Sequence, residues 1–289
     1  MQIWLPSLTS YCVLTNTRHH KITATQLQHH HNASTIKMTL LLSFIRSALH
    51  MLWMMATVIP WALCVLVVSL FAKPNTVYWL CAGWLKCAMW GLTKICGVSW
   101  RITGMENLPQ GEKDGAILLL KHQSTLETFL MPAIMPHPLA YVFKRELLYV
   151  PFFGWAMARM DMIHIDRSKK SEAFSKVVTQ GKRVMAQGVW VIMFPEGTRI
   201  PRGQTGNYKS GGTRLACETG RPVVPIAVSC ARHWPRKAFI KTPGVVDVVI
   251  GPAISSAGRQ PEELMQEVQT WIEAKMREID PEAYTAAKA

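Results

Sequence analysis

The stretch AILLLKHQSTLE, residues 116–127, decides the fold class. It opens with five consecutive apolar residues, passes through a short polar turn and continues into a segment with a helical pattern. A short, wholly apolar run bounded by polar residues is typical of a strand that is buried on both faces of a parallel sheet. A buried strand that leads directly into a helix is the repeating unit of α/β proteins.

The same alternation continues along the chain beyond residue 100. Predicted strands cover residues 116–120, 140–143, 162–165, 189–194, 223–228 and 245–250, and predicted helices cover residues 125–135, 152–160, 171–187, 211–218 and 261–279. The pattern predicts an α/β fold with a mixed, largely parallel sheet flanked by helices. The last helix is expected to pack on the core, and residues 201–212, rich in glycine and polar residues, are expected to form a mobile loop.

A different pattern precedes the predicted sheet. Residues 51–72 carry no charge, and these 22 residues are enough to cross a hydrocarbon core of about 30 Å as a helix. Residues 77–100 contain four tryptophans and two lysines, which is typical of a second helix at a membrane interface. We therefore predict an N-terminal membrane-embedded helical hairpin. A second full span, or a buried hairpin of a soluble protein, is the alternative.

The 289 residues suit one catalytic core with an anchor. We predict a leader without a fold at residues 1–37, membrane-anchoring helices at 38–100 and one catalytic domain at 101–289. The leader is polar and rich in histidine and threonine. A metal-binding histidine tract, an organellar transit peptide or a mis-assigned start, with Met38 as the true one, are alternatives for it.

The formal net charge is +14, and eight lysines and arginines precede the first acidic residue, Glu106. Basic charge beside an apolar segment favours a surface of anionic phospholipids. Nucleic acid is the competing partner, but no helix-turn-helix, zinc-finger or RNA-binding signature accompanies the charge, so we expect none. The excess of basic residues after the first membrane segment predicts a location in the cell inner (cytoplasmic) membrane, with the catalytic domain facing the cytoplasm.

The seven cysteines show neither CxxC pairs nor a cluster with histidine at metal-ligand spacing. The sequence therefore predicts no zinc site and no disulfide framework. Reduced cysteines agree with a catalytic domain that faces the cytosol.

His122 is the first candidate for catalysis. It follows a predicted strand and precedes a predicted helix, a position that faces a cleft in α/β sheets. Glu127 follows five residues later, and a carboxylate against one imidazole nitrogen leaves the other nitrogen free to take a proton from a hydroxyl. The alternative is structural, because Ser124 and Glu127 match a capping box that satisfies free amides at a helix start. Both roles can coexist.

A second motif, FPEGTR at residues 194–199, follows another predicted buried strand. Arg199 can grip a phosphate through two hydrogen bonds. Glu196 can accept a hydrogen bond from a substrate hydroxyl or orient Arg199. A surface salt bridge on a tight turn is the alternative interpretation of this motif.

Four blocks now stand in order along the chain. They are His122-Gln123-Ser124 with the acid at 127, residues 154–167 ending in Ile165-Asp166-Arg167, the FPEGTR block, and Val224-Pro225-Ile226. In order and approximate spacing they resemble the four blocks of the glycerolipid acyltransferases, and the chain resembles the bacterial 1-acyl-sn-glycerol-3-phosphate (lysophosphatidic acid) acyltransferases. The resemblance covers roughly residues 50–250, and four ordered blocks are far more specific than any one of them.

The resemblance implies an enzyme that transfers an acyl group from a thioester, acyl-CoA or acyl carrier protein, to the sn-2 hydroxyl of lysophosphatidic acid, giving phosphatidic acid in phospholipid biosynthesis. It implies His122 as the catalytic base, oriented by Glu127, and no cofactor. The implied glycerol phosphate site consists of Lys144, Arg167, Glu196, Gly197, Thr198 and Arg199. One departure stands out: the family usually has aspartate where this chain has Glu127, so the longer side chain must bend to keep the same contact with the imidazole.

Three other functions remain open. They are acyl transfer to another lysolipid, hydrolysis of lipid esters or thioesters, and membrane binding without catalysis. The chain has no Gly-x-Ser-x-Gly elbow, which argues against an acyl-enzyme of the α/β-hydrolase type. The aromatic segment at residues 147–155 is expected either to line an acyl-chain tunnel or to pack in the core.

Overall fold

The computed structural model describes residues 16–111, 114–150, 153–166 and 170–285. The helices are α1 (Asn16–Val68), α2 (Pro74–Gly91), α3 (Leu126–Ile134), α4 (Phe153–Arg159), α5 (Lys170–Met185), α6 (Gly211–Thr219), α7 (Pro261–Ile279) and α8 (Pro281–Thr285). The strands are β1 (Val98–Thr103), β2 (Ile117–Leu120), β3 (Leu139–Lys144), β4 (Ile163–Ile165), β5 (Trp190–Met193), β6 (Val223–Val228) and β7 (Gly244–Ile250). By contacts the chain divides into residues 1–45 and 46–289, and the second unit contains the sheet.

The strands form one seven-stranded sheet in the order β1-β7-β6-β2-β5-β3-β4. From β6 to β4 every neighbouring pair is parallel, whereas β7 runs antiparallel to β6 and parallel to β1. The predicted α/β fold with a mixed, largely parallel sheet is thus confirmed. Because the parallel strands point the same way, their carboxyl ends gather at one edge of the sheet, where ligands bind in open α/β sheets.

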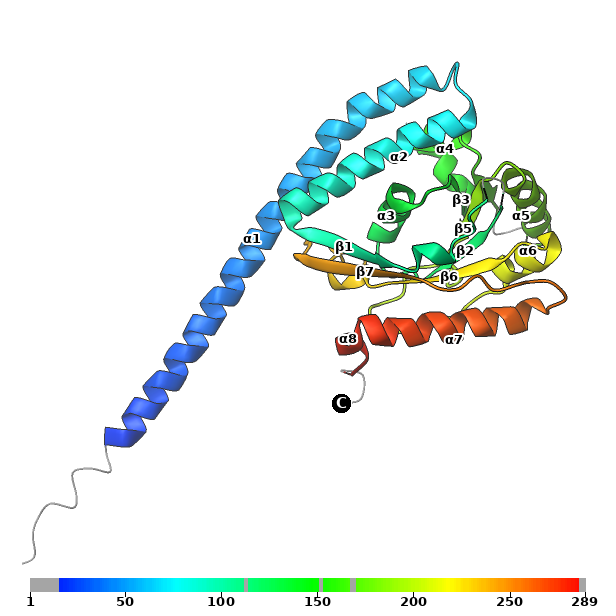
Figure 1. The fold of residues 1–289 in the computed structure, drawn as a ribbon. Helices are drawn as coiled ribbons and strands as arrows, with labels where there is room; N and C mark the ends of the chain where they lie inside the picture. The colour runs from blue at the N-terminus through cyan, green and yellow to red at the C-terminus, as the bar shows by residue number, and fades with distance from the viewer. Residues whose placement is uncertain (1–15, 112–113, 151–152, 167–169, 286–289) are drawn as a thin grey trace, which may run out of the picture. The chain divides into compact units, whose positions relative to one another are not determined.

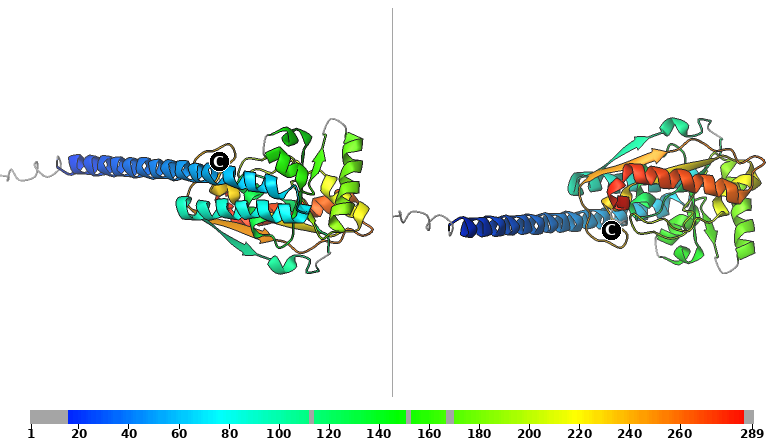
Figure 2. Two further views of the ribbon diagram at one scale, coloured as in Figure 1. Left: turned by 90° about the horizontal axis from the view of Figure 1, so that it is seen from above. Right: turned by 90° about the horizontal axis from the view of Figure 1, so that it is seen from below.

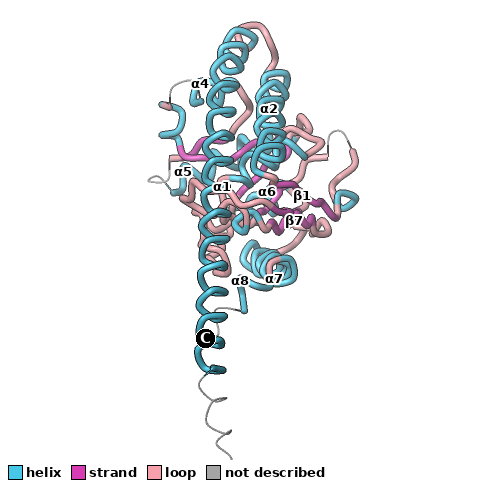
Figure 3. The backbone as a smooth tube through the Cα atoms, turned by 90° about the vertical axis from the view of Figure 1, so that its left-hand side faces the viewer, coloured by secondary structure: helices cyan, strands magenta, loops and turns pink. Residues whose placement is uncertain are grey.

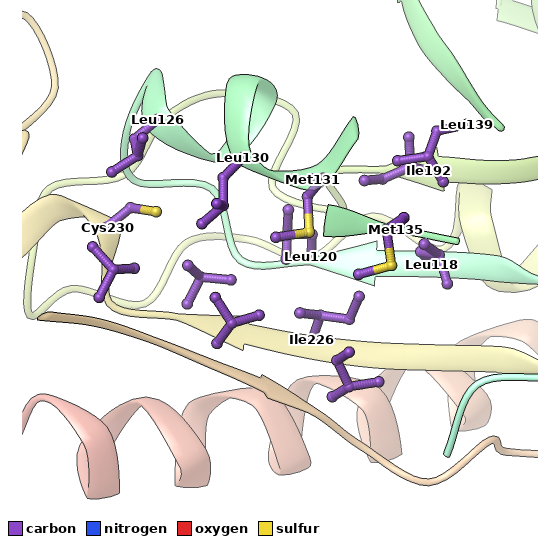
Figure 4. Packing of buried hydrophobic residues seen from close by; sticks show 14 of the residues in the cluster. Leu118, Leu120, Leu126, Leu130, Met131, Met135, Leu139, Ile192, Ile226 and Cys230 are labelled. Carbon is purple, nitrogen blue, oxygen red and sulfur yellow. The ribbon is translucent and has the colours of Figure 1, made fainter. Parts of the chain in front are cut away.

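Helices cover both faces of the sheet (Figure 1). Leu118 and Leu120 of β2 pack on the face that α2 and α3 cover, and Figure 4 shows Leu120 beside Met131 of α3 and Leu118 beside Met135. The alternating residues of β2 belong to a second core with α5, α6 and α7. Figure 2 shows α2 from above and α7 from below. All four side chains of β2 are fully buried, which explains why this strand reads as an unbroken apolar run.

One helix of the described chain, at Lys37–Val68 within α1, is long and apolar enough to cross a membrane by length and composition. Beyond residue 45, α1 lies beside α2 (Figure 3). Trp61 donates its indole hydrogen bond to the Leu80 carbonyl at 2.9 Å. The predicted apolar N-terminal helix is therefore present, while the embedding of α2 in a membrane stays a prediction.

Two boundaries in the N-terminal region differ from the sequence-based expectation. Residues 16–37, expected to lack a fold, belong to α1; no glycine or proline interrupts the chain from residue 16 to 59, so the helix extends toward the N-terminus. The helix expected over 77–100 ends at Gly91, and after a π-helical turn Gly97 adopts a positive φ of 69°. Residues 98–103 then form β1, so the sheet begins before the expected boundary at 101.

Residues 201–212, expected to be a mobile loop, are held by the C-terminal helices. Arg202 donates hydrogen bonds to both carboxylate oxygens of Asp280, at 2.7 and 2.6 Å. Thr205 donates to Glu273 at 2.7 Å. The glycine-rich composition correctly indicated a lack of regular structure as far as Ser210, after which α6 begins, but contacts with residues some 70 positions away leave no local signal in the sequence.

Candidate active site

His122 and Glu127 form a hydrogen-bonded pair at the carboxyl end of β2. His122 Nδ1 lies 2.7 Å from Glu127 Oε2. The other carboxylate oxygen, Oε1, accepts hydrogen bonds from the backbone amides of Gln123 and Ser124, at 3.0 and 2.8 Å. The carboxylate therefore caps the start of α3 and contacts the imidazole at the same time, so the two roles predicted for it coexist.

The carboxylate of Glu127 is fully buried, and burial raises its pKa well above the usual value while the two backbone amides act in the opposite direction. The Gln123 amide also lies 3.2 Å from Oε2, so donors face both oxygens of Glu127; we therefore assign Glu127 as the ionised acceptor and His122 Nδ1 as a further donor. The proton on Nδ1 leaves Nε2 with its lone pair. No described residue is hydrogen-bonded to Nε2, and His122 lines a cavity.

The surroundings of His122 keep its imidazole neutral. Its ring stacks on Phe194 at 3.8 Å between centroids and an interplanar angle of 19°. Burial, then the positive charge of Arg199, lowers the pKa of His122 to about 4, against the opposing charge of Glu196. A neutral imidazole with an unbonded nitrogen at a cavity wall can accept a proton at neutral pH.

The FPEGTR turn lies beside His122 because β2 and β5 are parallel neighbours. Leu119 pairs with Met193, and the same register places Glu196 opposite His122. The backbone amide of His122 donates to Glu196 Oε2 at 2.9 Å. The Glu196 side chain is fully buried and ion-paired with Lys121 at 2.7 Å, and it is absent from the cavity lining.

Glu196, expected to contact the glycerol phosphate, thus points into the protein and holds the backbone of His122. Spacing along the sequence predicts which strand end carries a residue, but not which of its neighbours binds the side chain. Its three successors do reach the cavity: Gly197, Thr198 and Arg199 all line it. Gly197 closes the turn with a hydrogen bond to Phe194 O at 2.9 Å and a φ of 68°, a conformation that favours glycine.

The cavity has a volume of about 1490 Å³ and two kinds of lining. One part is apolar and comes mainly from helices, including Trp61 of α1, Trp84 of α2 and Met157 of α4. The other part is basic and consists of Lys144, Arg199, Lys209, Arg236 and Lys237, and no aspartate or glutamate occurs among the described lining residues. We call these five basic residues the cationic rim. An apolar cavity whose described charged lining is entirely cationic suits an amphiphile with an anionic head group.

Comparison with known proteins agrees with this chemistry. Residues 99–229 match a family model described as Acyltransferase. A 1-acyl-sn-glycerol-3-phosphate acyltransferase of Pseudomonas aeruginosa is 44% identical over 201 residues, which cover 68% of this chain and 77% of the relative. The chain belongs to the 1-acyl-sn-glycerol-3-phosphate acyltransferase family.

More distant relatives of this acyltransferase family are similar as well. A 1-acyl-sn-glycerol-3-phosphate acyltransferase of Saccharomyces cerevisiae is 33% identical over 169 residues, covering 56% of this chain and 52% of the relative. The crystal structure of the 1-acyl-sn-glycerophosphate (LPA) acyltransferase PlsC from Thermotoga maritima matches with a TM-score of 0.66 and 25% identity. It covers 82% of this chain and 97% of that one.

The remaining basic residues of this acyltransferase compare with the sequence-based prediction in three ways. Lys144, predicted from the family resemblance, is the last residue of β3 and lines the same cavity as the FPEGTR turn. Arg167 lies outside the described residues. Lys209, Arg236 and Lys237 line the cavity although the sequence reading missed them; for Lys209 the available signal was its position two residues before a predicted helix.

The segment at 147–155 was expected either to line an acyl-chain tunnel or to pack in the core of this acyltransferase. Leu147 lines the cavity. Tyr149 and Trp155 are 71% and 50% exposed, so neither packs in the core. Phe152 lies outside the described residues, and the described aromatic rings that border the cavity come from other elements, among them Phe129 and Phe174.

Proposed function

We propose that this acyltransferase transfers an acyl group from a thioester to the sn-2 hydroxyl of lysophosphatidic acid, with His122 as the general base. The observation that carries the proposal is the His122–Glu127 pair, whose free imidazole nitrogen belongs to a residue lining a cavity with a purely cationic rim. The family membership supports the same reaction and the same acceptor.

The reaction proceeds by direct transfer between two bound substrates. His122 Nε2 takes the proton from the acceptor hydroxyl as the oxygen attacks the thioester carbonyl carbon. The carbon–sulfur bond then breaks, the thiolate takes the proton from Nε2, and an ester and a free thiol remain. Glu127 keeps the imidazole oriented throughout and stabilises its charged form between the two proton transfers. Much of the rate comes from placing hydroxyl and carbonyl in line.

The cationic rim supplies the binding site for the phosphate in this proposal. Arg199 and Lys144 hold the phosphate oxygens, Arg167 is proposed to join them, and Gly197 and Thr198 allow the head group to approach the turn. Glu196 acts indirectly, since it positions the amide of His122. The apolar part of the cavity takes the acyl chains.

A location in the cytoplasmic membrane belongs to the same proposal. The helix segment Lys37–Val68 is apolar, and only 11% of its apolar stretch is buried in the protein. This exposure suits contact with membrane phospholipids. The basic residues that follow it favour a catalytic domain on the cytoplasmic side, where acyl-CoA and acyl carrier protein are found.

The experiment that tests the function uses membranes that contain the full chain. They are incubated with lysophosphatidic acid and a labelled acyl thioester of either coenzyme A or acyl carrier protein. Label in phosphatidic acid, dependent on the acceptor, is the expected result. Labelled free fatty acid without acceptor would indicate a hydrolase instead, and acylation of other lysolipids alone would show that the acceptor is wrong.

Replacement of Arg199 by glutamine is expected to alter both binding and pH dependence. Loss of a charged hydrogen-bond donor raises the KM for lysophosphatidic acid by about tenfold to a hundredfold. The base works when deprotonated, so activity falls as the pH drops through the pKa of His122. Burial, and next to it Arg199, holds that pKa low, so the variant loses kcat/KM at a higher pH than the unmodified enzyme.

A pH profile of kcat/KM from pH 4 to 8 measures this shift. Arg199→Lys is the matched control, because it keeps the charge and hence the acidic limb, while it loses the planar donor pair. An acidic limb at the same pH in Arg199→Gln and in the unmodified enzyme would show that His122 does not sense Arg199.

A further inference from the structure

Lys121 is a fully buried lysine that directly precedes the base. Its ammonium group lies 2.7 Å from Glu196 Oε1, 2.6 Å from Glu273 Oε1 and 3.1 Å from the carbonyl oxygen of Gln204. Three acceptors match the three hydrogens of the ammonium group. The side chain is therefore fixed from three directions and contributes no charge to the cavity.

Glu273 connects this site to the C-terminal helix α7. Its carboxylate also accepts hydrogen bonds from Tyr208, at 2.9 Å, and from Thr205, at 2.7 Å. Only 5% of the Glu273 side chain is exposed. One carboxylate of α7 thus holds both Lys121, at the end of β2, and the segment that follows the FPEGTR turn.

The connection reaches the base in two further steps. Lys121 binds Glu196 Oε1, and Glu196 Oε2 accepts the backbone hydrogen bond of His122 at 2.9 Å. Gly206 donates a second backbone hydrogen bond to Glu196 Oε1 at 3.2 Å. Each link from Glu273 through Lys121 and Glu196 to the backbone amide of His122 is a direct hydrogen bond, and the side chains of Glu273, Lys121 and Glu196 are at most 5% exposed.

Stability alone does not account for this cluster. Two carboxylates and one ammonium lie in the interior, and well-packed apolar residues in place of such groups commonly leave a protein equally or more stable. What apolar residues cannot do is hold Glu196 in the one orientation that binds the amide of His122. The specific effect of the cluster is therefore on the geometry of the base.

We propose that Lys121 and Glu273 are positioning residues of the acyl transfer reaction. They fix the Glu196 carboxylate and through it the backbone of His122, so that Nε2 faces the hydroxyl of an acceptor whose phosphate is bound at Arg199. The proposal rests on the function proposed above, because it assumes that His122 is the base. It also assigns α7, which contributes no cavity-lining residue among those described, a part in catalysis.

The test compares Glu273→Gln with the unmodified full chain in membranes. The amide keeps the size of the side chain but weakens its hold on Lys121. Because a misplacement of the base by about 1 Å can cost a hundredfold, kcat is expected to fall about tenfold to a hundredfold, with both KM values within about twofold. Glu278→Gln is the matched control, since Glu278 lies on the same helix, is 64% exposed and should leave kcat unchanged.

A purely structural role makes a different prediction. It would lower the melting temperature but leave kcat per folded molecule unchanged at temperatures well below the transition. Lys121→Met alone leaves two unpaired buried carboxylates and can fail to fold. The double variant Lys121→Met/Glu273→Met leaves one unpaired buried carboxylate, Glu196, instead of two, so it should regain part of the melting temperature while kcat stays at least about tenfold low. Recovery of kcat together with stability would overturn the proposal.

The outcomes separate this proposal from the function on which it rests. If the unmodified chain makes no phosphatidic acid from either donor, the proposed function fails. If the unmodified chain is active and Glu273→Gln has the same kcat, the function stands and only the positioning role of α7 is wrong.

Discussion

Replacement of His122 by asparagine is expected to lower kcat for acyl transfer by about 10²- to 10⁴-fold, the usual contribution of a general base. The asparagine amide can still donate to Glu127 from the place of Nδ1, but it has no group at the place of Nε2. The variant therefore removes the base and preserves the cap of α3. KM for lysophosphatidic acid should change little, because the phosphate is bound by other residues.

Transfer of label into phosphatidic acid measures this loss, beside a melting curve of each variant. His137→Asn is the matched control: the His137 Nδ1 lies 3.2 Å from Gly188 O, and asparagine can keep a donor there. Its kcat should stay within about twofold of the unmodified enzyme, as is usual for changes away from the site. A His122→Asn variant with normal kcat would leave the mechanism without its base.

Glu127→Gln is expected to lower kcat by a similar factor, about 10²- to 10⁴-fold. The amide oxygen of glutamine must face the backbone amides of Gln123 and Ser124, which can only donate. Its NH₂ group then faces His122 Nδ1, so the imidazole proton moves to Nε2 and the base is lost. The variant keeps the helix cap and the volume of the side chain, and the melting temperature should change by only a few degrees.

Glu127→Asp tests the length of the side chain separately from its negative charge. The carboxylate stays, one methylene shorter, and the expected loss of kcat is about tenfold because the contact with Nδ1 lengthens. The same assay and melting curves apply to both variants. Equal activity of Glu127→Gln and Glu127→Asp would show that the tautomer of His122 is not controlled at this position.

The sequence was sufficient for most of the sheet. Six of the seven strands lie where apolar residues cluster in the sequence, and β2, β5 and β6, which are buried almost throughout, read as unbroken apolar runs. The strand that the sequence does not predict, β1, has only one fully buried residue, its first. Its mixed pattern, preceded by an apolar helix and containing Trp100, was therefore read as the end of that helix.

The residues of the candidate site likewise include some that the sequence predicts and some that it does not. His122 and Glu127 were predictable because a strand-to-helix turn places residues five apart in contact. Lys121, Glu196 and Glu273 were not, because their contacts join positions 75 to 152 residues apart, and the sequence contains no record of which buried charges meet. The longer Glu127 side chain reaches Nδ1 at 2.7 Å while it binds two amides of the turn, so the departure from the usual aspartate is accommodated locally.

The two-part lining of the cavity also suggests a route to redesign, in which the apolar wall is changed and the reacting pair is kept. The reacting pair depends on the hydrogen-bond ladder between β2 and β5, whereas the apolar wall depends on side chains such as Trp84 and Met157 from separate helices. Libraries that vary the wall can therefore select for bulky, branched or labelled acyl groups without disturbing proton transfer. The wall residues make no described hydrogen bond to His122 or Glu127, so such changes should alter the chain preference more than the proton transfer.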